Sequence, residues 1–165
     1  MMNIRFPQSI MRMCTSLSYN INEGLIRRRD DGGFLLPSYQ RGDVWTQEQK
    51  IRFIESLILN LPVGSYCVCI HENTNVDNAF RWELLDGQQR WTAIFNYVDD
   101  MFPVFGFKFS ELTETEKRYF RNRQFQLYLA NGLTEEEKYE LFQRLAYGGT
   151  PNTLDDKPTT KSVLR

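Results

Sequence analysis

The stretch LLDGQQRW, residues 84–91, places a polar cluster between two apolar segments of different periodicity. The segment before it, residues 80–85, has the β-rich composition of a strand. After it, apolar residues recur at the spacing of one helix face: Trp91, Ile94, Phe95 and Val98. The pattern therefore predicts a strand that turns directly into a helix at Asp86-Gly87. An ordinary turn needs the Asp-Gly but has no need of Gln-Gln-Arg.

Three capping boxes mark the starts of other helices. Thr46 with Gln49 precedes apolar residues at helical spacing and predicts a helix over about residues 47–60, with Pro62 ending the pattern. Two further boxes predict two more helices, the second ending at Gly148-Gly149; these boxes are Thr113 with Glu116 and Thr134 with Glu137.

The segment SYCVCIH, residues 65–71, predicts a strand buried on both faces. Cys67, Cys69 and His71 would share one face of it. Residues two apart on a strand are about 6.6 Å apart, whereas two thiolates on one zinc lie within about 4 Å of each other. We therefore interpret these residues as small core residues and not as metal ligands.

The 165 residues, 41% of them hydrophobic, suffice for one compact core. We expect a single α+β domain: a small mixed sheet with flanking helices and a helical C-terminal part. The expected domain spans residues 31–151, after a poorly determined segment 1–30 and before a C-terminal tail 152–165. The run RRRDDGG, residues 27–33, resembles a charged loop.

The charge balance of 20 basic against 21 acidic residues provides no global field that draws the chain to nucleic acid or anionic membranes. The longest apolar run, residues 58–63, is interrupted by Asn60 and Pro62 and is far shorter than a membrane span. No signal-peptide pattern opens the chain. Three cysteines without framework spacing are typical of a reducing compartment. We expect a soluble, cytoplasmic protein.

The polar residues of the turn suit a phosphate ligand. A strand-to-helix turn exposes unpaired N–H groups at the positive end of the helix dipole, and Gly87 permits close approach. Arg90 can add a bidentate contact to phosphate oxygens, while the amides of Gln88 and Gln89 can donate and accept. The alternative is a structural turn, either of the hairpin type or with Asp86 as a helix cap, whose polar neighbours are solvated. The short motif taken alone favours this alternative, because short motifs often match by chance.

A second polar cluster, LPSYQRGDVW at residues 36–45, places Gln40 and Arg41 between a short extended segment and the capped helix. The alternative is an ordinary loop whose arginine pairs with Asp43 or Glu48.

Four segments carry a family resemblance: PSYQRGDVW, IESLILNLPVGSYCV, WELLDGQQRWTAI and LFQRLAYGGTP. In this order, from about Leu36 to Pro151, the chain resembles the N-terminal DGQQR domain of GmrSD-type, modification-dependent restriction proteins, a branch of the ParB/sulfiredoxin-like superfamily. The resemblance implies a ParB/sulfiredoxin-like fold. It also implies nucleotide binding by Asp86, Gly87, Gln88, Gln89 and Arg90, with Gln40 and Arg41 completing the site.

The resemblance further implies a nucleoside triphosphatase with Mg²⁺ as cofactor. The implied catalytic residues are Asp86, Gln88, Gln89 and Arg90, with Asp86 also at the metal. The implied role is in a DNA-modification defence or counter-defence system against phage, with DNA and a separate nuclease or defence protein as partners and no membrane. The alternatives are a non-catalytic nucleotide- or DNA-binding module that acts as partner or inhibitor of a restriction system, and a degenerate scaffold that binds no nucleotide.

Three positions depart from the related families. Ala146 stands where the family has an asparagine before the Gly-Gly of the last helix, so any contact made by that amide is absent. Gln88 stands where sulfiredoxins have their catalytic cysteine, which excludes their redox chemistry. His71 is the only histidine, so no His-Asn-His nuclease pattern can be assembled and we expect no nuclease domain in this chain.

The segment KRYFRNRQFQLY, residues 117–128, interleaves basic and aromatic residues. Such a pattern suits phosphate contacts beside stacking faces. The predicted nucleic-acid contacts are Lys117, Arg118, Arg121 and Arg123. The alternative is a solvated helix face on which Glu114 pairs with Arg118 and the aromatic side chains point inward.

Overall fold

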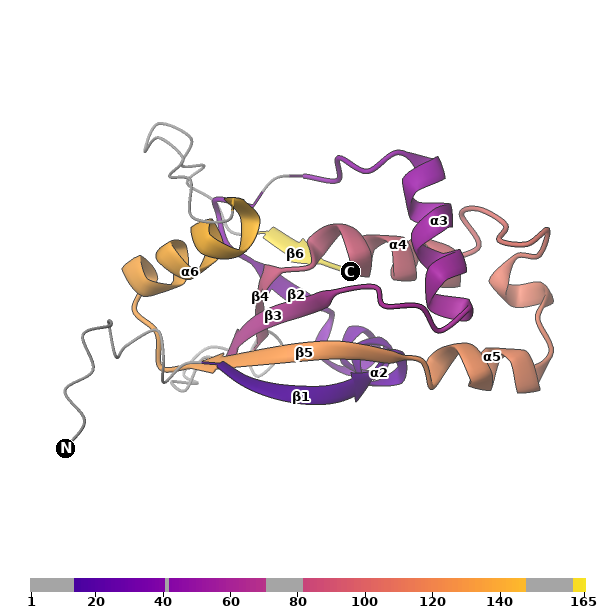
Figure 1. The fold of residues 1–165 in the computed structure, drawn as a ribbon, viewed down its shortest axis with the longest axis horizontal. Coiled ribbons are helices and arrows are strands. Elements are labelled where there is room, and N and C mark those ends of the chain that lie inside the picture. Colours follow the sequence, from indigo (N-terminus) through magenta and orange to yellow (C-terminus); the bar gives the residue numbers. More distant parts are fainter. Residues whose placement is uncertain (1–13, 41, 71–81, 148–161) are drawn as a thin grey trace.

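The computed structural model describes residues 14–40, 42–70, 82–147 and 162–165, which form one mixed sheet with helices around it (Figure 1). The strands are β1 (Cys14–Asn20), β2 (Phe34–Leu36), β3 (Ser65–Ile70), β4 (Trp82–Asp86), β5 (Gln124–Asn131) and β6 (Ser162–Leu164). The helices are α2 (Ile21–Asp31), α3 (Gln47–Ile58), α4 (Gln88–Val98), the short 3₁₀ helix η2 (Phe109–Glu111), α5 (Glu114–Arg121) and α6 (Glu135–Tyr147).

The six strands lie in the order β1-β5-β3-β4-β2-β6. β5 pairs antiparallel with β1 and parallel with β3, β3 pairs antiparallel with β4, and β2 pairs parallel with β4 and antiparallel with β6. Because parallel and antiparallel pairs alternate, the sheet is mixed. The predicted α+β class with a small mixed sheet and flanking helices is confirmed.

The central strand β3 separates two cores. Tyr66 and Val68 belong to the larger core, to which α2, α3 and α4 contribute. Cys67 and Cys69 belong to a smaller core that includes Leu141 of α6. The prediction of a strand buried on both faces is therefore confirmed. Among the described residues no cluster of His, Cys, Asp or Glu could hold a metal ion, whereas His71 lies outside them.

Trp91 lies at the centre of the larger core and is fully buried. Its ring lies 5.2–5.5 Å, centroid to centroid, from four other aromatic rings: Phe34, Tyr66, Phe95 and Phe125. A Cβ on Gly24 would overlap this ring, so α2 approaches α4 closely at a glycine. Burial of an aromatic side chain on this scale contributes about 2–3 kcal/mol, and it fixes the start of α4 against β3.

The three predicted capping boxes are confirmed. Helix α3 begins at Gln47 and ends at Ile58, close to the predicted limit, whereas the predicted end of the last helix at Gly148-Gly149 lies outside the described residues.

The prediction of a charged loop over residues 27–33 is wrong, because Arg27–Asp31 complete α2. Asn20 caps this helix and Gly32, with φ of 77°, ends it. Arg27 lies over the Trp82 ring at 3.7 Å, so its charged side chain covers an aromatic surface as part of the fold.

Both sheet edges use segments for which the sequence carried no signal. Residues 162–164 form β6 and pair with β2, and residues 14–20 form β1 and pair with β5. No helix in the described part of the chain is long and apolar enough to cross a membrane.

Candidate functional site

The DGQQR turn connects β4 to α4. Asp86 is the last residue of β4, and Gly87 is the N-cap of α4 with φ of 98°. A Cβ at Gly87 would lie 2.5 Å from Tyr66 Cβ, so both the backbone conformation and the close approach of β3 require glycine here. The alternative in which Asp86 caps the helix is wrong, since Asp86 lies in the strand.

The start of α4 differs from the starts of the other helices. Helices α2, α3, α5 and α6 each have an acidic residue in the first turn and a side-chain cap that accepts a hydrogen bond from a first-turn N–H. The capping residues are, in that order, Asn20, Thr46, Thr113 and Thr134. Within the described ranges, α4 has neither a side-chain cap nor a first-turn acid. The first-turn N–H groups of α4 therefore have, among the described residues, no side-chain acceptor of the kind found at the other helices, and the nearest carboxylate is that of Asp86, which precedes the N-cap.

Gln88 is the first residue of α4 and is only 8% exposed. No donor among the described residues hydrogen-bonds its side-chain oxygen. A buried carbonyl oxygen without a donor costs about 1–3 kcal/mol. Such a group is expected where a ligand or water supplies the missing donor.

Gln89 uses its whole carboxamide to hold the preceding loop. Its oxygen accepts from Val44 N at 3.0 Å and Trp45 N at 3.1 Å, and its nitrogen donates to Gly42 O at 2.9 Å. The amide predicted to contact a ligand is therefore bonded to the main chain of residues 42–45, which it fixes beside the turn.

Gln40 has a similar role on the other side of the turn. Its side-chain nitrogen donates to Leu84 O and Leu85 O, both at 2.9 Å. The structure therefore brings Gln40 to the end of β4, as expected, but its amide nitrogen joins the loop to the strand. Arg41 lies outside the described residues.

Arg90 and Asp86 form the charged part of the turn. Arg90 Nη1 donates to Ser65 O and lies 3.8 Å from Asp86 Oδ2, and both side chains are about one quarter to one third exposed. Burial raises the pKa of Asp86, whereas the Arg90 charge and the Gly87 N–H act in the opposite direction. Mg²⁺ commonly takes one or two carboxylates plus ligand phosphates, and Asp86 offers one such carboxylate.

Residues 22–159 match the family model described as GmrSD restriction endonuclease, N-terminal domain. The chain belongs to this family. The match extends further toward the N-terminus than the four resembling segments and includes all of α2 except its first residue. No curated protein and no solved structure matches the chain. Membership in the GmrSD N-terminal family associates the chain with restriction systems.

The loop of this GmrSD-type domain also has a buried contact that the sequence did not suggest. Lys50 is 8% exposed, and its Nζ donates to Asp43. In the carboxamide orientation that satisfies both of its ends, Asn96 Oδ1 accepts from Lys50 Nζ at 3.1 Å. Of the two partners expected for Arg41, Asp43 thus pairs with Lys50, and Glu48 pairs with Arg52 at 2.8 Å. The sequence did not indicate that Lys50 is buried, because a lysine in a helix of mixed charge is usually exposed.

A second buried ion pair lies on the α6 side of β4. Lys138 Nζ is 2.7 Å from Glu83 Oε2, also contacts Glu135, and is 1% exposed. Burial opposes the charged lysine, but the hydrogen bonds to Glu135 and Glu83 outweigh it and raise the pKa of Lys138. Ala146, which stands where the resemblance implies an asparagine, lies near the end of the same helix.

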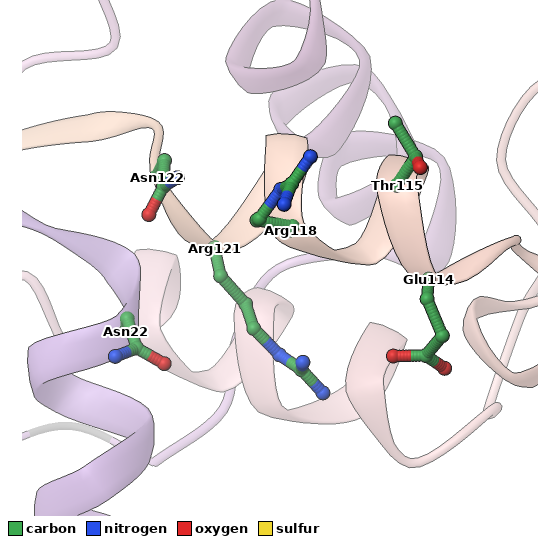
Figure 2. Close-up of a pocket in the computed structure, with 6 residues that line it drawn as sticks. All are labelled: Asn22, Glu114, Thr115, Arg118, Arg121 and Asn122. Atoms are coloured by element: carbon green, nitrogen blue, oxygen red, sulfur yellow. The ribbon is translucent and has the colours of Figure 1, made fainter.

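The predicted nucleic-acid residues divide into two groups. Lys117 pairs with Glu114 at 3.2 Å, whereas Glu114 was expected to pair with Arg118, and Arg123 lies over the Tyr119 ring at 3.6 Å. Arg118 and Arg121 instead line a pocket on α5 (Figure 2). The segment is not one helix, because α5 ends at Arg121 and β5 begins at Gln124.

Proposed function

We propose that this GmrSD-type domain binds a nucleoside triphosphate, with Mg²⁺, through the phosphates at the DGQQR turn. The observation that carries the proposal is the start of α4, where an uncapped dipole end coincides with the buried, unpartnered oxygen of Gln88 within the described part of the chain. An anion at this end would meet first-turn N–H groups and a favourable dipole.

The side chains at the turn and beside it have different roles in this proposal. Gln40 and Gln89 fix the loops that border the turn. Arg90, bonded to Ser65 O, offers its remaining donors and its charge to a phosphate. Asp86 would hold Mg²⁺, which would offset phosphate charge. Gln88 would accept a hydrogen bond from a ligand hydroxyl or from a water.

Hydrolysis is the catalytic form of this proposal. A water held by Gln88 or Asp86 would attack the terminal phosphorus, and the bond from that phosphorus to the bridging oxygen of the nucleoside diphosphate would break. The proton of the water would pass to the released phosphate, and Arg90 with Mg²⁺ would stabilise the charge on the phosphoryl oxygens. The role would be that of a triphosphatase in a defence or counter-defence system against phage, acting with DNA and a separate nuclease or defence protein. This proposed role includes a cytoplasmic location.

The second candidate is a module that binds nucleotide without hydrolysing it and acts as a partner or inhibitor of a restriction system. Two observations favour it: Ala146 supplies no amide at the family's asparagine position, and the amides of Gln40 and Gln89 are engaged in main-chain bonds.

Titration calorimetry with GTP, ATP and CTP in Mg²⁺ tests the binding site. The variant is Gln88→Leu, and Gln47→Leu is its control, because Gln47 is the first residue of the capped helix α3. We expect Gln88→Leu to bind nucleotide about tenfold more weakly, a change of about 1.4 kcal/mol. Its fold should be as stable as wild type or more so, because a buried acceptor is removed. Equal affinity of both variants would refute the site.

Phosphate release from the bound nucleotide, with and without DNA, then separates the two candidates. Turnover that Asp86→Asn abolishes supports the triphosphatase. Tight binding with no turnover supports the module, and no binding of any nucleotide refutes both.

A further inference from the structure

A second polar site lies on α5, outside the DGQQR turn. A pocket of about 440 Å³ is lined by Asn22, Glu114, Thr115, Arg118, Arg121 and Asn122. Five of these residues come from α5 and its C-cap, and Asn22 comes from the first turn of α2. In Figure 2, Arg121 extends between Asn22 and Glu114, and Arg118 projects from the middle of α5. The pocket shares no residue with the turn.

The lining residues follow one stripe of the helix. Thr115, Arg118 and Asn122 are three and four residues apart, which places them on one face. All three are exposed, so the pocket is open along α5. An open stripe accepts an extended ligand better than it encloses a small free one.

The charges in the pocket favour an anion. Its one carboxylate, Glu114, pairs with Lys117 at 3.2 Å, so the charges of these two largely offset each other. Across the described residues no carboxylate lies within ion-pair distance of Arg118 or Arg121. Arg121 lies 5.6 Å from the Phe109 ring centroid, which holds the guanidinium without neutralising it. Two uncompensated guanidinium groups therefore remain.

The remaining groups are suited to a phosphodiester. Guanidinium groups donate only, and the amides of Asn22 and Asn122 and the hydroxyl of Thr115 can donate as well. A phosphodiester carries one negative charge and its oxygens only accept, so it matches this donor set. We propose that the pocket binds a phosphate of the DNA backbone as a site separate from the nucleotide site. DNA is the source because the family match is to a restriction endonuclease.

A structural explanation competes with this proposal. Arg118 and Arg121 occupy the last turn of α5, where cations stabilise the negative end of the helix dipole. If that is their only role, replacing them lowers stability and leaves DNA affinity unchanged. The test therefore measures both quantities.

Fluorescence anisotropy of labelled DNA, as duplex and as single strand, measures the affinity over a range of salt concentrations. The variant is Arg118→Ala/Arg121→Ala. The control is Arg52→Ala/Arg144→Ala, which removes two exposed arginines from α3 and α6. We expect the pocket variant to bind DNA at least about tenfold more weakly than the control, independent of base sequence. The slope of log affinity against log salt should fall by about one, because one phosphate contact is lost.

A second variant acts in the opposite direction. Glu114→Gln removes the negative charge from the pocket rim, so we expect DNA affinity to rise about two- to threefold, on the order of one exposed charge interaction. This gain cannot arise from loss of folding.

Three results would overturn the proposal. One is a pocket variant that melts at lower temperature but binds DNA as the control does. Another is a wild-type protein without measurable DNA affinity at about 50 mM salt, whatever nucleotide the turn binds. The third is inorganic phosphate that binds the wild type but not the pocket variant while the two proteins bind DNA equally, because the pocket would then take only the free anion.

Discussion

Helices α3 and α4 pack against each other in the same core, yet their first turns are built in opposite ways. Thr46 and Gln49 bond each other's backbone N–H groups at the start of α3. Gly87 leaves the start of α4 without such bonds among the described residues, and Gln89 on its first turn reaches across to Val44 and Trp45. The backbone N–H groups at the start of α3 are bonded by side chains of the same helix start, whereas the start of α4 is joined by hydrogen bonds to a loop distant in the sequence.

Glutamine therefore has two different roles in the first turns of these two helices. Gln49 and Gln89 both lie in first turns, and both side chains accept from backbone N–H groups. The bond of Gln49 spans three residues, whereas those of Gln89 span more than forty. A local bond stabilises one helix, and a long-range bond positions two loops relative to each other.

The largest expected effect on stability comes from replacing the glycine at the start of α4. Gly87→Ala places a Cβ against Tyr66 and strains a backbone with φ of 98°. We expect a loss of about 3 kcal/mol in the free energy of unfolding, measured by urea denaturation. Gly42→Ala is the matched control, because no atom lies within 4 Å of its added Cβ. Equal losses in the two variants would contradict the packing argument.

The next effect tests the long-range bonds. Gln89→Ala removes three hydrogen bonds to the loop, and we expect a loss of about 2 kcal/mol together with faster hydrogen exchange at the amides of Val44 and Trp45. Gln49→Ala should cost less and leave those two amides unchanged. Unaltered exchange in Gln89→Ala would show that the loop is held by other contacts.

The third prediction concerns α3, whose first turn is capped by the side chain of Thr46. Thr46→Ala removes a side-chain cap and should cost about 1 kcal/mol in stability, while Thr46→Ser should retain most of it. Nucleotide affinity, measured by calorimetry, should be unaffected in both, because Thr46 lies at the start of the other helix. A substantial loss of affinity in Thr46→Ala would mean that the two helix starts are coupled.

The smallest effect concerns pH. Burial raises the pKa of Asp86 in the folded protein, so the folded state binds this proton more tightly than the unfolded state. The stabilising contribution is therefore present at low pH, below the unfolded pKa, and is lost as pH rises through the folded pKa. Asp86→Asn should remove that decline. Urea denaturation of wild type and Asp86→Asn from acid to neutral pH measures how the free energy of unfolding depends on pH. The same pH dependence in both proteins would contradict this prediction.

Features with local signals were the ones that the sequence predicted. The capping boxes at Thr46, Thr113 and Thr134 each involve residues three apart, and each helix was found. The strand-to-helix turn at Asp86-Gly87 was also found, because the hydrophobic period changes there. Local rules suffice where both partners lie within one turn of helix.

The bonding of the site could not be predicted in the same way. Gln40 and Gln89 were identified as site residues, but their partners lie 44 to 47 residues away, and no pattern in the chain specifies a main-chain acceptor. Helix α2 was missed because arginines occupy positions that usually face solvent, whereas here Arg27 covers Trp82. Strand β6 has only three residues, too few for a period.

The buried pair of Lys138 and Glu83 has a mechanical consequence. Glu83 lies on the strand that ends in the DGQQR turn, and its partner belongs to α6 on the opposite side of the sheet from α4. If α6 slid along β4 by one helical turn, the ion pair between Lys138 and Glu83 would break, and breaking a buried pair costs about 3–5 kcal/mol. The ion pair therefore favours one register of α6 on β4, because any shift of α6 along the strand breaks it.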